Sequence, residues 1–233
     1  MRRVLTALLF LLLPLAVLAQ PIAPGYREGV DYETLPQPIP TWGKGKIEIA
    51  EVFSYACVHC FHFQPEVNKF KQTMAKDVRW EYVPAAFGGH WDVFARAYFA
   101  AQILGVQAKT HDAVFNGIFV ANKIKTGSPE ELADLYASLG ADRAKFLVAF
   151  NSPDATARLA RAREFGLRSG VQGTPTLIVN GKYRVMGRED TGVTGMFRTA
   201  EFLVAKEREA AKAPKAKPAA KPAATPTTAA VKS

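Results

Sequence analysis

The sequence contains only two cysteines and four histidines among 233 residues, which limits the metal sites that it can form. A structural zinc site needs four ligands, usually supplied by two pairs of Cys or His at short spacing. Cys57 and Cys60 form one such pair, but no second pair follows at the spacing of a zinc finger. Covalent haem attachment needs a histidine directly after the second cysteine, where this chain has Phe61. We therefore expect no metal and no bound cofactor.

Beyond its first 19 residues the chain also lacks an apolar run of the roughly 20 residues that cross a membrane. The apolar run at the start follows Arg2 and Arg3 and ends in Val17-Leu18-Ala19, where small residues occupy the positions that signal peptidase recognises. We expect residues 1–19 to be a signal peptide that is cleaved after Ala19, with an uncleaved anchor as the alternative. The protein is then exported to a compartment where disulfides persist.

A strong charge of either sign is missing from the body of the chain, although the formal net charge of the whole is +9. Of the 30 Lys and Arg residues, two lie in residues 1–19 and five in residues 211–233, which contain no acid. Residues 20–210 therefore carry 23 basic and 21 acidic residues, a net charge of +2. This is an ordinary surface, so we expect no nucleic-acid partner.

The C-terminal segment 211–233 consists of Ala, Pro, Lys and Thr with almost nothing large to bury. Such a composition predicts a disordered tail that is partly extended by its prolines. We expect it to be solvated, with a weak electrostatic attachment to anionic envelope polymers or lipid headgroups as the alternative.

The remaining residues suggest a mixed α/β fold. Residues 20–45 are assigned to an irregular N-terminal lead-in, because 26–41 is rich in Pro and Gly. Bulky β-forming residues predict strands at 46–53 and 78–84, with a helix from about 57 to 74 between them.

The second half begins with a helical block. Apolar residues recur at helical spacing from 91 to about 150, and Ser128 and Ser152, each followed by Pro, predict helix N-caps. Asn180-Gly181 joins two short β-runs and predicts a hairpin. A last helix is expected from about 191 to 211. The predicted order is β-α-β, a block of helices, then α-β-β-α.

The C-x-x-C pair favours redox chemistry over a structural disulfide. A disulfide that closes a loop of four residues contributes roughly 2 kcal/mol, against about 3 kcal/mol for a loop of 15 residues. At the start of a helix, however, unpaired backbone N–H groups and the helix dipole stabilise a thiolate on Cys57. His59, when protonated, adds a second positive neighbour. Both effects lower the thiol pKa and make Cys57 a nucleophile and a good leaving group.

The motifs F-S-Y-A-C-V-H-C, with Glu51 upstream, and G-T-P-T-L-I-V-N-G-K-Y, residues 173–183, make the chain similar to the DsbA family of thiol:disulfide interchange proteins. The resemblance extends over about residues 26–210. It implies a thioredoxin-like α/β fold, residues 46–88 and 151–210, with an inserted helical domain, residues 89–150. A depressed thiol pKa and a strongly oxidising disulfide are implied by this resemblance as well.

The resemblance also assigns roles to single residues. It implies that Pro175 is cis and faces the cysteines, which leaves the Thr174 backbone free to pair with a client strand. Glu51 would relay protons beneath the buried thiol, with a strand-end acid that reaches water as the alternative. Val58 and His59 form the dipeptide that tunes the redox potential. Many family members have Pro where this chain has Val58, which leaves the strength of the oxidant open.

The other three histidines, His62, His90 and His111, are interpreted as ordinary surface residues. Apolar residues near Phe61, Phe63 and Phe87 are candidates for a peptide-binding patch, but the sequence does not say which of them are exposed.

The sequence and the resemblance together predict a periplasmic thiol:disulfide oxidoreductase that donates the Cys57–Cys60 disulfide to newly exported, unfolded proteins with free thiols. The resemblance implies reoxidation by a quinone-linked membrane partner of the DsbB type. Only about 25 residues precede the first predicted strand, which leaves no room for a separate dimerisation domain, so we expect a monomer. The alternatives are a disulfide isomerase or reductase of the same compartment and a redox-inert holdase or envelope-binding module.

Overall fold

The computed structural model describes residues 25–212. The predicted signal peptide, residues 1–19, and most of the predicted tail lie outside the described residues, so those two predictions stay untested. None of the helices in the described part of the chain is long and apolar enough to cross a membrane.

Five strands in the described residues form one mixed sheet. They are β1 (Glu33–Thr34), β2 (Ile47–Phe53), β3 (Val78–Pro84), β4 (Thr176–Val179) and β5 (Tyr183–Met186). Their order across the sheet is β1-β5-β4-β2-β3. β2 and β3 run parallel, and every other neighbouring pair is antiparallel. β2 therefore has a neighbouring strand on each side, and six of its seven residues are buried.

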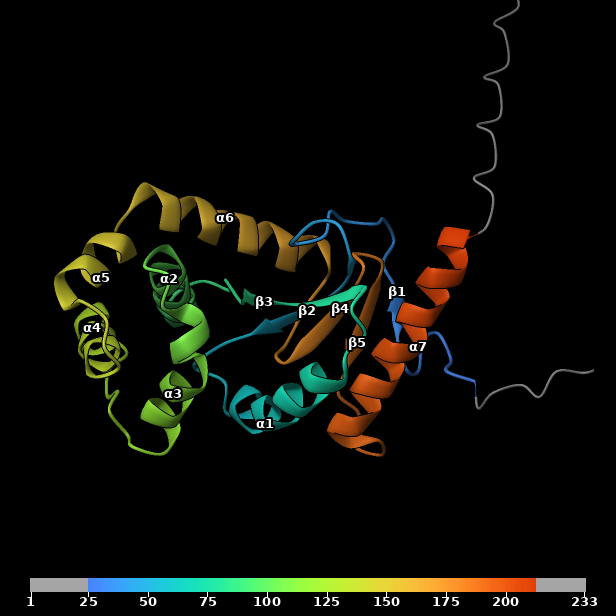
Figure 1. Cartoon of the computed structure of the whole chain (residues 1–233), viewed down its shortest axis with the longest axis horizontal. Helices are drawn as coiled ribbons and strands as arrows, with labels where there is room; N and C mark the ends of the chain where they lie inside the picture. The colour runs from blue at the N-terminus through green and yellow to red at the C-terminus, as the bar shows by residue number, and fades with distance from the viewer. Residues whose placement is uncertain (1–24, 213–233) are drawn as a thin grey trace, which may run out of the picture.

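Seven helices accompany the sheet within residues 25–212. They are α1 (Val58–Thr73), α2 (His90–Ile103), α3 (Gln107–Phe119), α4 (Pro129–Ser138), α5 (Arg143–Phe150), α6 (Pro153–Arg168) and α7 (Gly192–Lys212). α1 and α7 lie on one side of the sheet, and α6 extends along the other (Figure 1). α2 to α5 gather at the end of the molecule away from α7 (Figure 1).

The elements that position the cysteines are those that the sequence predicts. The strands expected at 46–53 and 78–84 and the helix expected at about 57–74 are confirmed as β2, β3 and α1. The hairpin is confirmed too, because Asn180 and Gly181 have φ of 50° and 64°, the left-handed values that a two-residue turn of this kind requires. Ser128 and Ser152 each accept a hydrogen bond from the backbone N–H three residues on, as predicted for N-caps.

The lead-in is more ordered than predicted. It contains β1, in which Glu33 and Thr34 pair with Arg184 and Tyr183 of β5. A strand of two residues has no periodicity to detect, and Tyr32 and Leu35 on either side of it are buried against the rest of the molecule.

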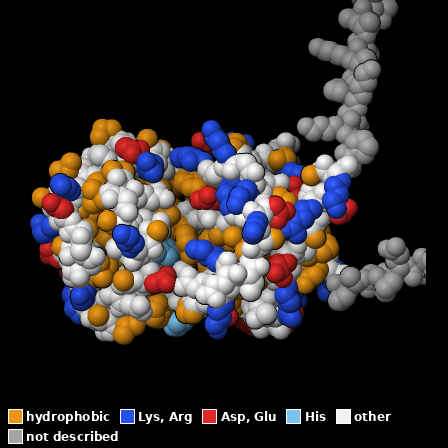
Figure 2. Space-filling view, viewed as in Figure 1, with side chains coloured by type: hydrophobic (Ala, Val, Ile, Leu, Met, Phe, Trp, Pro, Cys, Tyr) orange, Lys and Arg blue, Asp and Glu red, His pale blue; other side chains and the backbone are white. Residues whose placement is uncertain are grey.

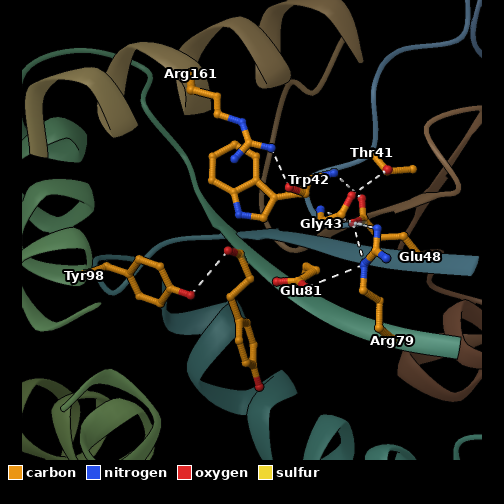
Figure 3. Close-up of polar contacts among 9 residues, drawn as sticks. Thr41, Trp42, Gly43, Glu48, Arg79, Glu81, Tyr98 and Arg161 are labelled. Carbon is orange, nitrogen blue, oxygen red and sulfur yellow. Dashed lines mark hydrogen bonds and ion pairs between the residues drawn. The ribbon is translucent and has the colours of Figure 1, made fainter. Parts of the chain in front are cut away.

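The end of the lead-in is joined to β2, β3 and α6 by a cluster of polar contacts (Figure 3). The fully buried Glu48 accepts hydrogen bonds from the backbone N–H groups of Trp42 and Gly43, both at 2.6 Å, and from Arg79 Nη2 at 2.8 Å. Arg161 of α6 lies over the Trp42 ring, with its guanidinium carbon 4.0 Å from the ring centroid (Figure 3). We call these five residues the Glu48 cluster.

Aromatic side chains join the carboxyl end of β2 to the helical block. Phe53 and Tyr55 pack edge to face with each other, with ring centroids 5.2 Å apart. Both also contact Tyr98 of α2 and Phe115 of α3. The segment that leads into Cys57 is therefore held by side chains of both the sheet and the helices.

Candidate functional site

Cys57 is the N-cap of α1, which is the position that the sequence predicts for the reactive sulfur. Its Sγ accepts a hydrogen bond from the backbone N–H of Cys60 at 3.4 Å. The turn before it is closed by the Cys57 N–H, which donates to the Ser54 carbonyl at 3.1 Å, and by the Ala56 N–H, which donates to Ser54 Oγ at 3.1 Å. Both cysteines are free thiols in this structure.

The two sulfurs have opposite electrostatic surroundings. The pKa of Cys57 is lowered to about 5, first by the hydrogen bond from the Cys60 side chain, and also by Thr174 and by the backbone N–H groups of Cys60 and His59. Burial acts in the other direction but is outweighed. The pKa of Cys60 is raised, first by burial and then by its bond to Cys57. Cys57 is therefore the thiolate at neutral pH, and Cys60 keeps its proton.

The second motif lies beside the first, because β4 is the neighbour of β2 in the sheet. The Thr174-Pro175 bond is cis, as predicted. As a thiol, Cys57 Sγ donates to the Thr174 carbonyl at 3.3 Å. The pairing of Val52 with Thr176 explains this approach, because it sets the residues before β4 beside those after β2. Two segments that are 117 residues apart in the sequence meet at one sulfur atom.

Glu51 lies in β2 and is fully buried, so the alternative of a strand-end acid that reaches water is wrong. Its Oε2 has no hydrogen-bond partner among the described residues. Burial raises the pKa of this carboxyl to about 8, with smaller opposing effects from Lys71 and Trp80. The negative charge of Glu51 in turn raises the pKa of Cys60. The carboxyl is thus close enough to the buried thiol to influence its ionisation.

A groove of about 520 Å³ opens beside the cysteines. His59, Thr174 and Pro175 line it on the catalytic side, and Met186 and Met196 lie among its other lining residues. Val58 and His59, the predicted tuning dipeptide, are both exposed, and His59 is the one that lines the groove. Of the three predicted patch residues, Phe87 is exposed, Phe61 is half-buried and Phe63 is buried.

The interpretation of His111 as a surface residue is wrong. His111 of α3 is buried, and its Nδ1 lies 2.8 Å from the Tyr55 hydroxyl, with which it forms a hydrogen bond. Burial lowers its pKa to about 3, with a contribution from Lys71, so the ring is neutral. The sequence holds a signal for this position, because His111 lies three and four residues before the apolar Val114 and Phe115. His62 and His90 are exposed, as predicted.

The family model that matches this chain describes a DSBA-like thioredoxin domain and covers residues 48–193. The match includes both motifs and the helices between them. The helical block that separates α1 and β3 from β4 and β5 is therefore part of the family's fold.

Curated proteins match nearly the whole chain. The thiol:disulfide interchange protein DsbA of Pseudomonas aeruginosa is 36% identical over 209 residues, which cover 90% of this chain and 98% of that protein. The protein of the same name from Azotobacter vinelandii is 33% identical over 200 residues, which cover 85% and 93%.

Solved structures match as well. The oxidoreductase DsbA from Xylella fastidiosa is 40% identical, with a TM-score of 0.74 over 79% of this chain and 98% of that one. The crystal structure of Pseudomonas aeruginosa DsbA gives a TM-score of 0.75 at 36% identity, over 81% and 97%.

Proposed function

The chain belongs to the DsbA family of thiol:disulfide oxidoreductases, with Cys57 and Cys60 as its redox pair, and we propose that it acts as a disulfide donor to exported proteins. The observation that carries this proposal is the contrast between the two sulfurs. Stabilisation of the Cys57 thiolate favours the dithiol form of the protein, and a stable dithiol makes the disulfide a strong oxidant.

The reaction proceeds in two exchanges. A client thiolate attacks Cys57 Sγ of the disulfide, the Cys57–Cys60 bond breaks, and Cys60 leaves with the electron pair and takes up a proton. A second client thiolate then attacks the client sulfur of the mixed disulfide. Cys57 leaves as a stabilised thiolate, the client gains a disulfide, and the protein is reduced.

Glu51 is assigned the proton transfer to and from Cys60. A carboxyl with a pKa of about 8 holds a proton at neutral pH and can release it, which suits a group that exchanges protons with a buried thiol. Its unpartnered oxygen and its influence on the pKa of Cys60 support this assignment.

Thr174 and Pro175 are assigned to client binding. They border the groove beside Cys57, and an extended client segment there can pair with exposed backbone groups. Val58 and His59 are assigned to tuning the potential, because they lie between the two sulfurs and the His59 N–H stabilises the Cys57 thiolate.

Membership of the family supports the proposal for the clients, the reoxidant and the location. We assign the protein to the periplasm, its clients to newly exported proteins with free thiols, and its reoxidation to a quinone-linked membrane partner of the DsbB type. Residues 46–88 and 151–210 are assigned to the thioredoxin-like domain and residues 89–150 to the helical insertion.

Two measurements on the purified protein test the donor assignment. A pH titration of thiolate absorbance should show Cys57 ionised well below neutrality while Cys60 stays protonated. Equilibration with glutathione buffers should give a potential well above the −270 mV of thioredoxin, toward about −120 mV. A potential close to that of thioredoxin contradicts a donor and supports a reductase.

The variant Cys57→Ser separates the enzyme from a holdase. It should lose client oxidation entirely, because no mixed disulfide can form. If protection of unfolded clients from aggregation were the function, the variant would protect them as well as the wild type does.

A further inference from the structure

A second, smaller cavity lies next to the catalytic groove. It has a volume of about 120 Å³ and is lined on one side by Gly29–Glu33 of the lead-in. Met186, Gly187 and Arg188 line both this cavity and the groove, so the chain that leaves β5 forms a wall common to the two.

The topology of the sheet explains why the cavity lies beside the groove. Val52 pairs with Thr176, Thr176 pairs with Met186, and β5 pairs with β1 at Arg184 and Glu33. The end of β2, the start of β4, the end of β5 and the chain before β1 thus meet at one edge of the sheet. Along this edge the order is Cys57, Pro175, Met186 and then Val30.

Exposed apolar side chains flank the cavity. Val30 is 43% exposed and Met186 is 46% exposed, and both belong to the cavity lining. They are two of only seven large apolar residues that are exposed in residues 25–212. Exposed apolar side chains in the lining of a small cavity favour an apolar side chain of a partner.

The walls of the cavity are fixed by ion pairs. Arg188 Nη1 bonds Asp31 Oδ1 at 2.9 Å, and Arg188 Nε bonds Asp190 Oδ1 at 2.9 Å. Asp31 Oδ2 also accepts from the Arg27 backbone N–H at 2.7 Å. The lead-in and the chain after β5 are therefore tied together, which holds the cavity open in a preformed shape.

We propose that this cavity is a side-chain subsite for client polypeptides, in which Val30 and Met186 contact one apolar residue of an extended client segment. The inference rests on the proposed function, because it extends the client groove beyond Pro175 toward the lead-in. The occupant is a client segment because the cavity continues the groove that holds the reactive sulfur.

The topology also sets the distance between the client's cysteine and this apolar residue. Neighbouring strands lie about 4.8 Å apart, and the path from the start of β4 across β5 to the lead-in crosses about two such spacings. An extended peptide advances about 3.3 Å per residue, so the apolar residue lies about three residues from the reacting cysteine.

The test uses synthetic peptides with one cysteine and one leucine, the leucine moved stepwise through the six positions on each side in an otherwise Ser/Gly sequence. Each peptide thiolate attacks Cys57 of the oxidised protein, and Cys60 leaves and is protonated. The measured quantity is the second-order rate constant for opening of the Cys57–Cys60 disulfide, read by acid quench, unfolding and alkylation of the released Cys60 thiol, which is buried in the folded protein. We expect leucine about three residues away on one side to raise this rate constant about tenfold over serine at that position.

The variant Val30→Ser should reduce this leucine-to-serine ratio to about 2 or less, whereas Val30→Leu should preserve or increase it. Val148→Ser is the matched control, because Val148 is a 73% exposed valine of α5 in the helical block, and it should keep the ratio. Reaction of all peptides at equal rates, or a leucine preference that Val30→Ser retains, would overturn the subsite and leave the proposed function intact. Failure of every peptide to reduce the protein would overturn both.

Discussion

β2 contains two buried glutamates, Glu48 and Glu51, and they differ in their hydrogen-bond partners. Glu48 near the amino end receives hydrogen bonds from two backbone N–H groups and from the Arg79 guanidinium. Glu51, three residues on, keeps an oxygen with no partner in residues 25–212. One strand thus carries a carboxylate that is fully paired and another that burial makes hard to ionise.

This difference indicates a structural role for Glu48 and a chemical role for Glu51. A buried charge that is fully hydrogen-bonded holds its neighbours in one arrangement, and removing it leaves its partners unpaired. A buried acid without partners is a proton donor and acceptor close to neutral pH. Proximity to the sulfurs is the second difference, because Glu51 influences the pKa of Cys60.

The largest effect is expected from Glu48→Ala. The largely buried Arg79 guanidinium would lose its hydrogen-bonded carboxylate and keep only the 3.6 Å ion pair with Glu81, and the Trp42 and Gly43 N–H groups would lose their acceptor. The free energy of unfolding should fall by about 3–5 kcal/mol in urea titrations. Glu66→Ala is the control, because Glu66 pairs with Lys69 at the surface, and it should change stability by less than about 0.5 kcal/mol. A loss below about 1 kcal/mol for Glu48→Ala would contradict the structural role of Glu48 and its difference from Glu51.

The next effect is a pH-dependent gap in stability between the reduced and oxidised forms. Cys57 has a pKa of about 5 in the folded dithiol form, against 9.0 as its ordinary value. Between these pH values the unfolded chain binds more protons, so the reduced form gains stability as pH rises and loses it as pH falls through about 5.

The oxidised form has no such thiol, so its stability does not rise in this way. The free energy of unfolding of the reduced form minus that of the oxidised form should therefore be about 3 kcal/mol larger at pH 9 than at pH 5, after allowance for the partial solvent exposure of Cys57. Urea unfolding of both forms at several pH values checks this. A gap that stays constant with pH would mean that Cys57 titrates like an isolated thiol, against the donor assignment.

Glu51→Gln tests the other carboxylate. The Glu51 pKa of about 8 exceeds its ordinary 4.5, so the folded protein binds more protons than the unfolded chain between these values. Wild-type stability therefore receives a contribution that is lost as pH rises through about 8, and the variant should lack this decline. We expect the variant to be more stable by about 2 kcal/mol at pH 8 and to oxidise clients about tenfold more slowly.

The activity of Glu51→Gln decides its role. Its pH–rate profile should lose an inflection close to pH 8, which a structural role would leave in place. Glu209→Gln, at an exposed position of α7, should match the wild type in both stability and rate. An unchanged profile for Glu51→Gln would remove Glu51 from the proton transfer.

The smallest effect is expected from Gly43→Ala. A Cβ at this position would lie 2.7 Å from Arg79 Nε and 2.8 Å from Glu81 Oε1. Arg79 cannot withdraw without weakening its bonds to Glu48, so stability should fall by about 1–2 kcal/mol in urea. The thiol pKa of Cys57 should not change, because the Glu48 cluster lies at the far end of β2. A shifted thiol pKa would show that the two ends are coupled.

Local patterns are easier to predict from sequence than the pairing of segments that are distant along the chain. The C-x-x-C spacing, the Asn-Gly turn and the Ser-Pro caps are local patterns, and each appears in the structure where the sequence predicts it. The partner of Glu48 depends on the register of a parallel strand pair, in which Glu48 lies opposite Arg79. No local pattern encodes that register.

Local patterns also fail where a side chain has a choice of partners. Glu131 lies three residues after the N-cap Ser128, the position from which a glutamate in a capping box accepts from the N-cap N–H. Its carboxylate instead accepts from the N–H groups of Lys125, Thr126 and Gly127. The backbone of the loop before α4 therefore takes the place of the N-cap N–H as the partner of this carboxylate. His111 was missed for a similar reason, because its partner Tyr55 lies 56 residues away in the sequence.

The mixed character of the surface charge agrees with the sequence-based expectation. Lys, Arg, Asp and Glu side chains are interspersed over the face shown in Figure 2, with no continuous field of one sign. The near balance of charges in residues 20–210 anticipates this mixture, since the excess of lysine lies in the tail.

The bond between Tyr55 and His111 limits how far the protein can be dissected. Tyr55 precedes Cys57 by two residues, and its hydroxyl is held by a helix of the inserted block. Grafting the C-x-x-C segment onto a bare scaffold, or trimming the helices to obtain a smaller catalyst, would leave that hydroxyl without its partner. Miniaturised or chimeric versions of this enzyme therefore need α3 together with the motif.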